Sequence, residues 1–268
     1  ATLLSGGLDS SIISAIVALN KKNILSTYSI DYEDNDKFFK SNTFQVSQDE
    51  KYIEIMSKAF NTKHTYMTIS QNEVADYLIK TLKLRDYPGM IDIDSSLLWF
   101  SEKISEKYKV ILSGECADEI FGGYPWFYKK ELNNRKEFPW INNIDYRQKL
   151  INKNLRRKIN IHKIIKKEYM NTIRELSLKD RKDKYKKLFY INMTHFMTTL
   201  LDRKDRMTMG ATIEARVPFA DTKLIEYLWN MPFEYKYKDG IEKYILREAF
   251  KDILPQEILN RKKNPYPK

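Results

Sequence analysis

The sequence contains little cysteine and histidine and no long hydrophobic run. Its single cysteine, Cys116, excludes a framework of internal disulfide bonds and any zinc site that needs several cysteines. The three histidines are scattered and lack the paired spacing of metal ligands, so we do not expect a transition-metal enzyme. No stretch approaches the roughly 20 apolar residues of a membrane span. These absences favour a protein of a reducing compartment with no membrane partner, and we expect a cytoplasmic location.

The first residues also lack two features. There is no initiator methionine, and there is no basic stretch followed by the apolar core of a signal peptide. The opening run Ala-Thr-Leu-Leu-Ser-Gly-Gly is typical of a buried strand that ends in a turn. We therefore expect the 268 residues to be a domain of a longer protein.

Positive charge is concentrated in one segment. The chain is 42% apolar and 31% charged, as globular proteins are, and its formal net charge is +11. Residues 147–187 hold 16 Lys and Arg against 4 Asp and Glu. A basic segment can bind nucleic acid, but apolar residues recur at helical spacing here: Ile161, Ile164, Ile165, Tyr169, Ile173 and Leu176. We interpret the segment as solvated amphipathic helices, so a nucleic-acid partner is not expected, and RNA binding is the alternative.

Strands and helices alternate along the first 112 residues. Strands are predicted at Thr2–Ser5, Ile24–Ile30, His64–Ile69 and Lys109–Leu112. Helices are predicted at Asp9–Leu19, Asp49–Phe60, Glu73–Leu84 and Ser95–Tyr108, with a polar loop over about residues 31–48. After about residue 128 the pattern is almost entirely helical. We predict an α/β fold, with a doubly wound parallel sheet in residues 1–128 and a helical C-terminal layer in residues 129–268.

Ligands of such sheets bind beyond the carboxyl ends of the strands, and Ser5–Ser11 lies there. Gly6 and Gly7 let the backbone approach an anion, Ser5, Ser10 and Ser11 add hydroxyl donors, and the next helix contributes free N–H groups. The Gly-Lys-Ser/Thr of a Walker A loop is absent. The alternative is an ordinary glycine turn with serine caps. The whole run Ser-Gly-Gly-Leu-Asp-Ser, between a strand and a helix, favours a phosphate-binding loop.

Two groups of carboxylates accompany this loop. Asp9 would repel a phosphate unless a cation lay between them, and Mg²⁺ prefers one or two carboxylates together with phosphate oxygens, so Asp9 is a candidate magnesium ligand. Residues 110–124 form a second strand–loop–helix unit that carries Glu115, Asp118 and Glu119. Helix capping is the alternative for these acids, above all for Glu119. Asp9 and Asp118 together would make a two-carboxylate metal site.

Ser5–Ser10 resembles the PP-loop of the N-type ATP pyrophosphatases, whose fold is adenine nucleotide alpha hydrolase-like. In that family the loop holds the β,γ-diphosphate of ATP, and AMP is transferred to a substrate oxygen. Residues 110–124 (VILSGECADEIFGGY) resemble the signature of the asparagine synthase synthetase domain. Further segments agree in order along the chain: Leu201–Met207, Glu214–Phe219, Glu242–Glu248 and Leu254–Tyr266.

The resemblance implies a carbon–nitrogen ligase that amidates aspartate to asparagine through a β-aspartyl-AMP intermediate, with ammonia as nitrogen donor and ATP and Mg²⁺ as cofactors. It assigns ATP binding to Leu3, Ser5, Gly6, Gly7, Asp9, Ser10, Ile30, Ser113, Gly114 and Arg247. Glu115 would act on the incoming ammonia and Lys243 would stabilise the α-phosphate, while Asp9 and Asp118 would hold the metal. The alternative role for Asp118 is contact with the amine of the substrate. Outside its motif, Lys243 would be interpreted as a surface lysine.

The acceptor pocket departs from the family pattern. Many members carry Thr-Thr-Ile-Arg before a Ser/Thr pair, which aligns here with Ser95-Ser96, and the position of the arginine is Ile93. Asp92 and Asp94 either bind the substrate ammonium or cap the following helix. Relatives on this fold amidate other carboxylates or close β-lactam rings, so another acceptor is an alternative.

The family's glutaminase domain, with its N-terminal cysteine nucleophile, does not occur in these residues. The internal Cys116 has no histidine within sequence reach and cannot replace it. We expect that domain in the full-length chain as a partner, and a homodimer is one expected assembly. Two further readings stay open: a tRNA-modifying PP-loop enzyme, and a non-catalytic nucleotide-binding domain.

Overall fold

The computed structural model describes residues 1–38, 49–133 and 136–263. The chain forms two compact units, each assembled from separate stretches. The first unit comprises residues 1–117, 199–225 and 245–268, and the second comprises residues 118–198 and 226–244. The predicted organisation, one synthetase domain over residues 1–268 with an α/β part up to residue 128, stays a prediction.

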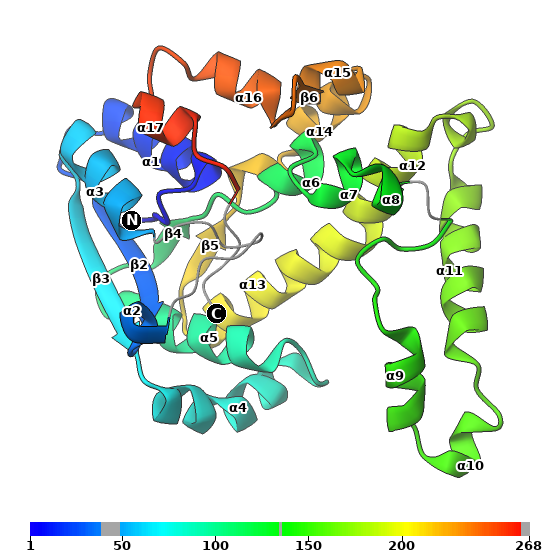
Figure 1. Ribbon diagram of the computed structural model, residues 1–268. Helices are drawn as coiled ribbons and strands as arrows, with labels where there is room; N and C mark the ends of the chain where they lie inside the picture. The colour runs from blue at the N-terminus through cyan, green and yellow to red at the C-terminus, as the bar shows by residue number, and fades with distance from the viewer. Residues whose placement is uncertain (39–48, 134–135, 264–268) are drawn as a thin grey trace. The chain divides into compact units, whose positions relative to one another are not determined.

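The first unit is built on a parallel sheet (Figure 1). In the described part of the chain its five strands lie in the order β3-β2-β1-β4-β5, with the bounds β1 Thr2–Leu3, β2 Ser26–Tyr32, β3 Lys63–Ile69, β4 Val110–Leu112 and β5 Glu214–Arg216. Every pairing between neighbouring strands is parallel. The order runs outward from β1 in both directions, so the sheet is doubly wound and its switch point lies between β1 and β4. The predicted fold class is confirmed.

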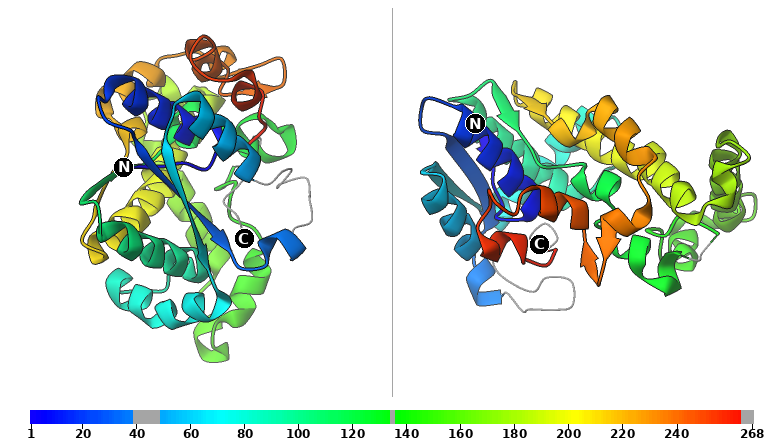
Figure 2. Two further views of the ribbon diagram at one scale, coloured as in Figure 1. Left: turned by 90° about the vertical axis from the view of Figure 1, so that its left-hand side faces the viewer. Right: turned by 90° about the horizontal axis from the view of Figure 1, so that it is seen from above.

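Helices cover both faces of this sheet. Those of the first unit are α1 Leu8–Asn20, α2 Asn35–Phe38, α3 Glu50–Ala59, α4 Gln71–Arg85, α5 Ile91–Ser105, α13 Thr198–Gly210, α16 Tyr244–Ala249 and α17 Gln256–Leu259, with a 3-10 turn at Pro218–Ala220. Figure 1 shows α1, α3 and α17 together on one side of the sheet, and α5 and α13 on the other, with α4 packed against α5. Seen from the side, β2 and β3 twist about each other (Figure 2), as long parallel strands do.

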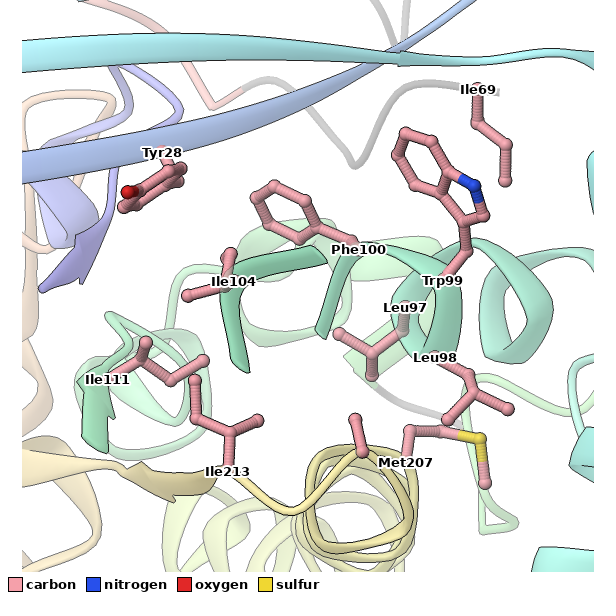
Figure 3. Close-up of a cluster of buried hydrophobic side chains, with 11 residues drawn as sticks. Tyr28, Ile69, Leu97, Leu98, Trp99, Phe100, Ile104, Ile111, Met207 and Ile213 are labelled. Carbon is pink, nitrogen blue, oxygen red and sulfur yellow. The ribbon is translucent and has the colours of Figure 1, made fainter. Parts of the chain in front are cut away.

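A hydrophobic cluster fills the space between the sheet and α5 and α13 (Figure 3). Helix α5 contributes the run Leu97–Phe100 and Ile104, the strands contribute Tyr28 and Ile111, and α13 contributes Met207. Met207 and Ile104 are 0% and 1% exposed. This packing fixes β1 and β4 beside each other, and therefore positions the loops that follow them.

The predicted bounds of the first four strands and their helices agree with the structure to within four residues, but three features differ. The edge strand β5 was expected to be part of the helical layer. Helix α5, expected from Ser95, begins at Ile91, so Asp92 and Asp94 lie inside its first turn. The predicted polar loop 31–48 contains the end of β2 and the short helix α2, and its residues 39–48 lie outside the described part.

The second unit is mainly helical, as predicted for this region. Its elements are α6 Ala117–Phe121, α7 Pro125–Tyr128, α8 Lys130–Asn133, α9 Ile144–Leu150, α10 Lys153–Arg156, α11 Ile161–Glu175, a 3-10 turn at Asp180–Lys182, α12 Lys184–Ile191, a π-helical turn at Asn192–Met197, α15 Phe233–Lys236 and the antiparallel strands β6 Tyr237–Lys238 and β7 Ile241–Glu242. Helix α14, Thr222–Trp229, spans the boundary between the units.

An aromatic core holds the second unit together. Phe127, Phe138, Phe189 and Tyr169 are buried in it, and the rings of Phe127 and Phe189 stack at 4.5 Å. Helix α11 carries much of the basic segment and turns its apolar face, with Tyr169 and Ile173, into this core. Helix α11 is therefore folded and amphipathic, as the apolar spacing within the basic segment predicted.

Within residues 1–38, 49–133 and 136–263, no helix is both long enough and apolar enough to cross a membrane.

Candidate functional site

The turn after β1 is closed by its own hydroxyl groups. The Ser10 Oγ lies 3.0 Å from the Ser5 Oγ, accepts a hydrogen bond from the Ser5 N–H at 3.2 Å, and donates to the Gly7 carbonyl at 3.2 Å. Gly7 occupies the N-cap of α1, and Asp9 lies in its first turn. The loop therefore ends at a helix N-terminus, where unpaired N–H groups and the helix dipole favour an anion.

Gly6 allows this loop to lie directly on α3. Its φ of 66° is in the left-handed region, and a Cβ atom there would come within 2.6 Å of the Tyr52 Cβ and 2.9 Å of the Ile53 backbone nitrogen. Both the backbone conformation and the close approach exclude a larger side chain. The positive φ expected of the loop glycines occurs at Gly6 but not at Gly7, whose φ is −75°, and their approach to an anion stays a prediction. The contact with α3 was not predicted.

The second predicted loop meets the first. Gly114, two residues after β4, lies against the first turn of α1, since a Cβ atom at this position would be 2.6 Å from the Ser10 nitrogen and 2.7 Å from the Asp9 carbonyl carbon. The neighbouring Ser113 is 4% exposed, and its N–H donates to the Arg216 carbonyl at the end of β5. Two motifs more than 100 residues apart thus share the switch-point edge of one sheet.

Glu115 follows Gly114 and faces two cations of α13. Its Oε1 lies 3.0 Å from the Lys204 Nζ and 3.6 Å from an Arg203 terminal nitrogen. The side chain of Lys204 is 5% exposed. Cys116 adopts a φ of 73°, and its side chain is buried, so the chain turns sharply between Glu115 and α6. The carboxylate of Glu115 is consequently held by fixed positive charge in a sheltered position.

Asp118 and Lys243 pair within the second unit. The Lys243 Nζ lies 2.6 Å from the Asp118 Oδ1, and the lysine side chain is 4% exposed. Lys243 has a φ of 56°, unusual for a residue with a side chain, and such strain persists where the surroundings over-determine it. Gly123 makes room for the pair: a Cβ atom there would lie 2.0 Å from the Asp118 Oδ1 and 2.3 Å from the Lys243 Cε. The alternative of a solvated surface lysine is excluded by this burial.

The remaining candidate ATP residues lie in the first unit. Leu3 ends β1 and pairs with Tyr28, and Ile30 lies in β2; both pack at the edge of the hydrophobic cluster. Arg247 lies in α16, and its Nη1 donates to the Arg261 carbonyl at 3.2 Å and to the Leu259 carbonyl. The guanidinium of Arg247 therefore holds the turn that follows α17.

The segment expected to bind the acceptor contains a buried ion pair. Asp94 is 1% exposed, and its Oδ2 lies 3.5 Å from an Arg85 nitrogen. Burial raises the pKa of Asp94 above its ordinary value, while Arg85 and Arg203 act in the opposite direction. Ile93 is buried and Asp92 is exposed. Asp94 therefore pairs with Arg85, and its carboxylate also accepts a hydrogen bond from the N–H of Met90, the N-cap residue of α5.

Among the described residues, no three or more His, Cys, Asp or Glu side chains gather closely enough to hold a metal ion. A single carboxylate such as Asp9, together with phosphate oxygens and water, would suit Mg²⁺, which is commonly bound in this way and not in a closed protein cage. Asp9, beside the loop in the first turn of α1, is placed for that role.

Three residues near the site were not predicted as site residues. Lys204 and Arg203 pair with Glu115, and the Arg261 guanidinium donates to the Ser5 carbonyl at 3.0 Å. All three lie inside segments that resemble family motifs. Their position in those segments was the available signal, but nothing in sequence spacing relates residue 261 to residue 5.

Comparison with known proteins gives one consistent result. The family model described as asparagine synthase matches residues 1–268. Asparagine synthetase (glutamine-hydrolyzing) 3 of Bacillus subtilis (strain 168) is 50% identical over 100% of this chain and 44% of its own length. Asparagine synthetase (glutamine-hydrolyzing) 1 of the same organism is 28% identical over 99% of this chain and 46% of its own. A probable asparagine synthetase (glutamine-hydrolyzing) of Acanthamoeba polyphaga mimivirus is 30% identical over 98% of this chain and 38% of its own. The chain thus spans less than half the length of these relatives.

Proposed function

The chain belongs to the asparagine synthase family, and from that premise we propose that it is the synthetase half of an ATP-dependent, AMP-forming ligase that amidates aspartate with ammonia. The observation that carries the proposal is the contact of the loop after β1 with the loop after β4. The backbone of Gly114 lies against Asp9 and Ser10 at the switch point of the sheet. Nucleotides bind at this position in doubly wound sheets.

The nucleotide is bound by residues of both loops. Ser5, Gly6, Gly7 and Ser10 hold the β,γ-diphosphate through backbone N–H groups and hydroxyls, and Ser113 and Gly114 line the opposite side. Leu3 and Ile30, near the ends of adjacent strands, contact the adenine. Arg247 supports the site from α16.

The reaction has two steps. In the first, a side-chain oxygen of aspartate attacks the α-phosphorus, the bond to the bridging oxygen breaks, and pyrophosphate leaves. Lys243 stabilises the negative charge that develops on the α-phosphate oxygens, and its pairing with Asp118 orients its ammonium group. In the second, ammonia attacks the carbonyl carbon of β-aspartyl-AMP, AMP leaves, and Glu115 accepts the proton released from the nitrogen.

Magnesium is part of this proposal. Asp9 and Asp118 are the carboxylates that would hold it, and its charge would neutralise the departing pyrophosphate. Asp118 has two predicted roles, metal ligand or partner of the substrate amine, and in this structure its carboxylate pairs with Lys243. The glutaminase partner is proposed because relatives named glutamine-hydrolyzing are about twice as long as this chain. A cytoplasmic location, predicted from the composition, belongs to the same proposal.

An isotope experiment tests the reaction. The 268-residue polypeptide is incubated with ATP, Mg²⁺, ammonium chloride and aspartate whose side-chain carboxylate carries ¹⁸O. We expect asparagine, pyrophosphate and AMP in equal amounts, with one ¹⁸O atom in each AMP, detected by mass spectrometry. ADP as product would overturn the PP-loop assignment, and unlabelled AMP would exclude an acyl-adenylate. Glutamate and other carboxylates, tested in parallel, decide the acceptor.

Substitution of the catalytic lysine provides a second test. Lys243→Ala removes the cation proposed for the α-phosphate, so we expect the AMP-forming rate to fall roughly 100- to 1000-fold, the usual effect of losing one electrostatic donor to a transition state. ATP affinity, measured by calorimetry, should change much less because the diphosphate is held by the loop. Undiminished turnover of this variant would remove Lys243 from the mechanism.

A further inference from the structure

The C-terminal segment returns to the loop after β1. Arg261 follows α17, and its side chain is 3% exposed. Its Nη1 donates to the Ser5 carbonyl at 3.0 Å, and its Nη2 pairs with the carboxylate of Asp49 at the start of α3. Its guanidinium carbon lies 4.0 Å from the centroid of the Tyr52 ring. Figure 1 shows α17 beside α1 and α3, in agreement with the contacts among these helices.

The contact with Ser5 fixes a peptide plane. The Ser5 carbonyl and the Gly6 N–H belong to one planar trans peptide, in which the two groups point in opposite directions. A carbonyl that faces Arg261 therefore directs the Gly6 N–H away from Arg261. Gly6 has no room to move toward α3, because its α-carbon already lies against Tyr52 and Ile53. The loop is thus held by α3 on one side and by the guanidinium at its carbonyl.

Arg261 is itself held in place. Its own carbonyl and that of Leu259 accept hydrogen bonds from Arg247 of α16. Two arginines in series therefore connect α16, the turn after α17 and the loop after β1. A guanidinium suits this position because it can donate to two acceptors in one plane while its face stacks on a ring, which a lysine ammonium cannot do.

We propose that Arg261 is a positioning residue for pyrophosphate: it presents the Gly6 N–H to the β,γ-phosphates without touching them. The inference rests on the proposed function for the identity of the ligand. It concerns the affinity for the diphosphate group alone, and therefore can be tested without the amidation reaction.

The test compares two probes by calorimetry in the presence of Mg²⁺: inorganic pyrophosphate, which needs the loop, and AMP, which lacks the β- and γ-phosphates. In Arg261→Lys we expect the Kd of pyrophosphate to rise at least tenfold and the Kd of AMP to change less than twofold. Arg206→Lys is the matched control, because Arg206 also bridges a carbonyl, that of Leu84, and a carboxylate, that of Asp202. This control should bind both probes as the unmodified chain does.

A second variant covers the case in which Arg261→Lys does not fold. Tyr52→Leu keeps the Cβ atom beside Gly6 but removes the ring beneath the guanidinium. This variant should also raise the Kd of pyrophosphate. The proposal would be overturned if a folded variant lost affinity for pyrophosphate and for AMP equally, or if its affinity for pyrophosphate were unchanged. An unmodified chain that binds pyrophosphate but forms no AMP would refute the proposed function and leave this inference standing, whereas a chain that binds no pyrophosphate would refute both.

Discussion

Glycines with no space for a Cβ atom decide the geometry around the candidate residues. Gly6 and Gly114 bring backbone segments together around the loop after β1, and Gly123 lets the pair of Asp118 and Lys243 lie on the main chain. The first two shape the loop that is proposed to bind diphosphate through its N–H groups, and the third lies against a charged pair. Substitution at Gly123 therefore tests the pair without removing either charge.

We expect Gly123→Ala to lower the rate of AMP formation about 100-fold, because the added methyl group must push the Asp118 carboxylate and the Lys243 side chain apart, and displacements of about 1 Å at reacting groups have effects of this size. Steady-state assays with aspartate and ammonia measure the change. Gly240→Ala is the control: its φ of 81° strains the backbone of any substituted residue, but no atom lies within 4 Å of its virtual Cβ, so the added methyl group meets no neighbour. Equal losses in both variants would contradict the role assigned to the pair.

A buried lysine in the second unit makes stability depend on pH. Lys236 is 2% exposed, donates to the Leu228 carbonyl at 2.8 Å, and lies 3.9 Å from the centroid of the Phe189 ring. Burial lowers its pKa to about 7, whereas in the unfolded chain it keeps its proton to about pH 10.5. Between these values the unfolded state binds more protons, so the free energy of unfolding rises with pH.

The expected contribution of Lys236 between pH 6 and pH 9 is roughly 2 to 3 kcal/mol, from 1.36 kcal/mol for each pKa unit. Between pH 6 and pH 9, the free energy of unfolding of Lys236→Met should rise by roughly 2 to 3 kcal/mol less than that of the unmodified chain. Urea denaturation at both pH values measures the difference. Lys238→Met replaces an exposed lysine nearby and should keep the full pH dependence. If the unmodified chain and both variants had the same pH dependence, Lys236 would be charged in the folded chain over the whole range from pH 6 to pH 9.

At the scale of elements, helix α4 begins with a signal that the sequence analysis overlooked. The Ser70 Oγ accepts from the Glu73 N–H at 3.2 Å, and the Glu73 carboxylate accepts from the Ser70 N–H at 2.9 Å. This reciprocal arrangement is the capping box, which is readable from Ser-x-x-Glu before a helix. Its recognition would have placed the helix start at Gln71 instead of Glu73.

We expect Ser70→Ala to lower the free energy of unfolding by about 1 kcal/mol, the usual effect of losing a serine N-cap. Ser105→Ala is the comparison, because the Ser105 hydroxyl donates back to the Glu102 carbonyl of its own helix and satisfies no unpaired N–H. That variant should change stability by less than about 0.5 kcal/mol. Chemical denaturation of both variants measures the difference, and a Ser70→Ala chain as stable as the original would mean that water replaces the cap.

The elements that could be predicted are those with a local signal. Hydrophobic periodicity identified the strands that carry the loops, because each is a run of apolar residues followed by glycine. Strand β5 has no such pattern: only Ala215 of its three residues is apolar, and pairing with β4 makes it a strand. Helix α5 begins before the predicted Ser95, and Asp94 in its first turn accepts from the Met90 N–H and pairs with Arg85, which lies outside the helix.

The same distinction applies to the candidate site. The loop residues Ser5–Ser10 were found because their chemistry is contiguous in sequence. The contacts of Glu115 with Lys204 and of Ser5 with Arg261 join distant segments, the second across 256 positions, and no spacing rule predicts them. Motif resemblance located the segments, whereas the identity of the contacting atoms needed the fold.

At the scale of the whole molecule, the two units divide the proposed chemistry. The first unit carries the loops proposed to bind diphosphate, and the second carries Asp118 and Lys243. The units interleave along the chain, so neither can be cut out as one continuous segment. Tests of function therefore use all 268 residues. The predicted homodimer stays a prediction, and sedimentation of the same polypeptide would measure it.

The source of nitrogen is the last property that these residues predict. Their single cysteine, Cys116, is 2% exposed and lies in a tight turn, so it is not accessible as a nucleophile for glutamine. We expect these 268 residues to form asparagine with ammonium chloride and to form at least 100-fold less with glutamine at the same concentration. Treatment with iodoacetamide should leave Cys116 unmodified, as checked by mass spectrometry, and leave the ammonia-dependent rate unchanged. Equal rates with glutamine and ammonia would require a glutamine-hydrolysing site within this chain, and would contradict the proposal that a separate domain supplies the nitrogen.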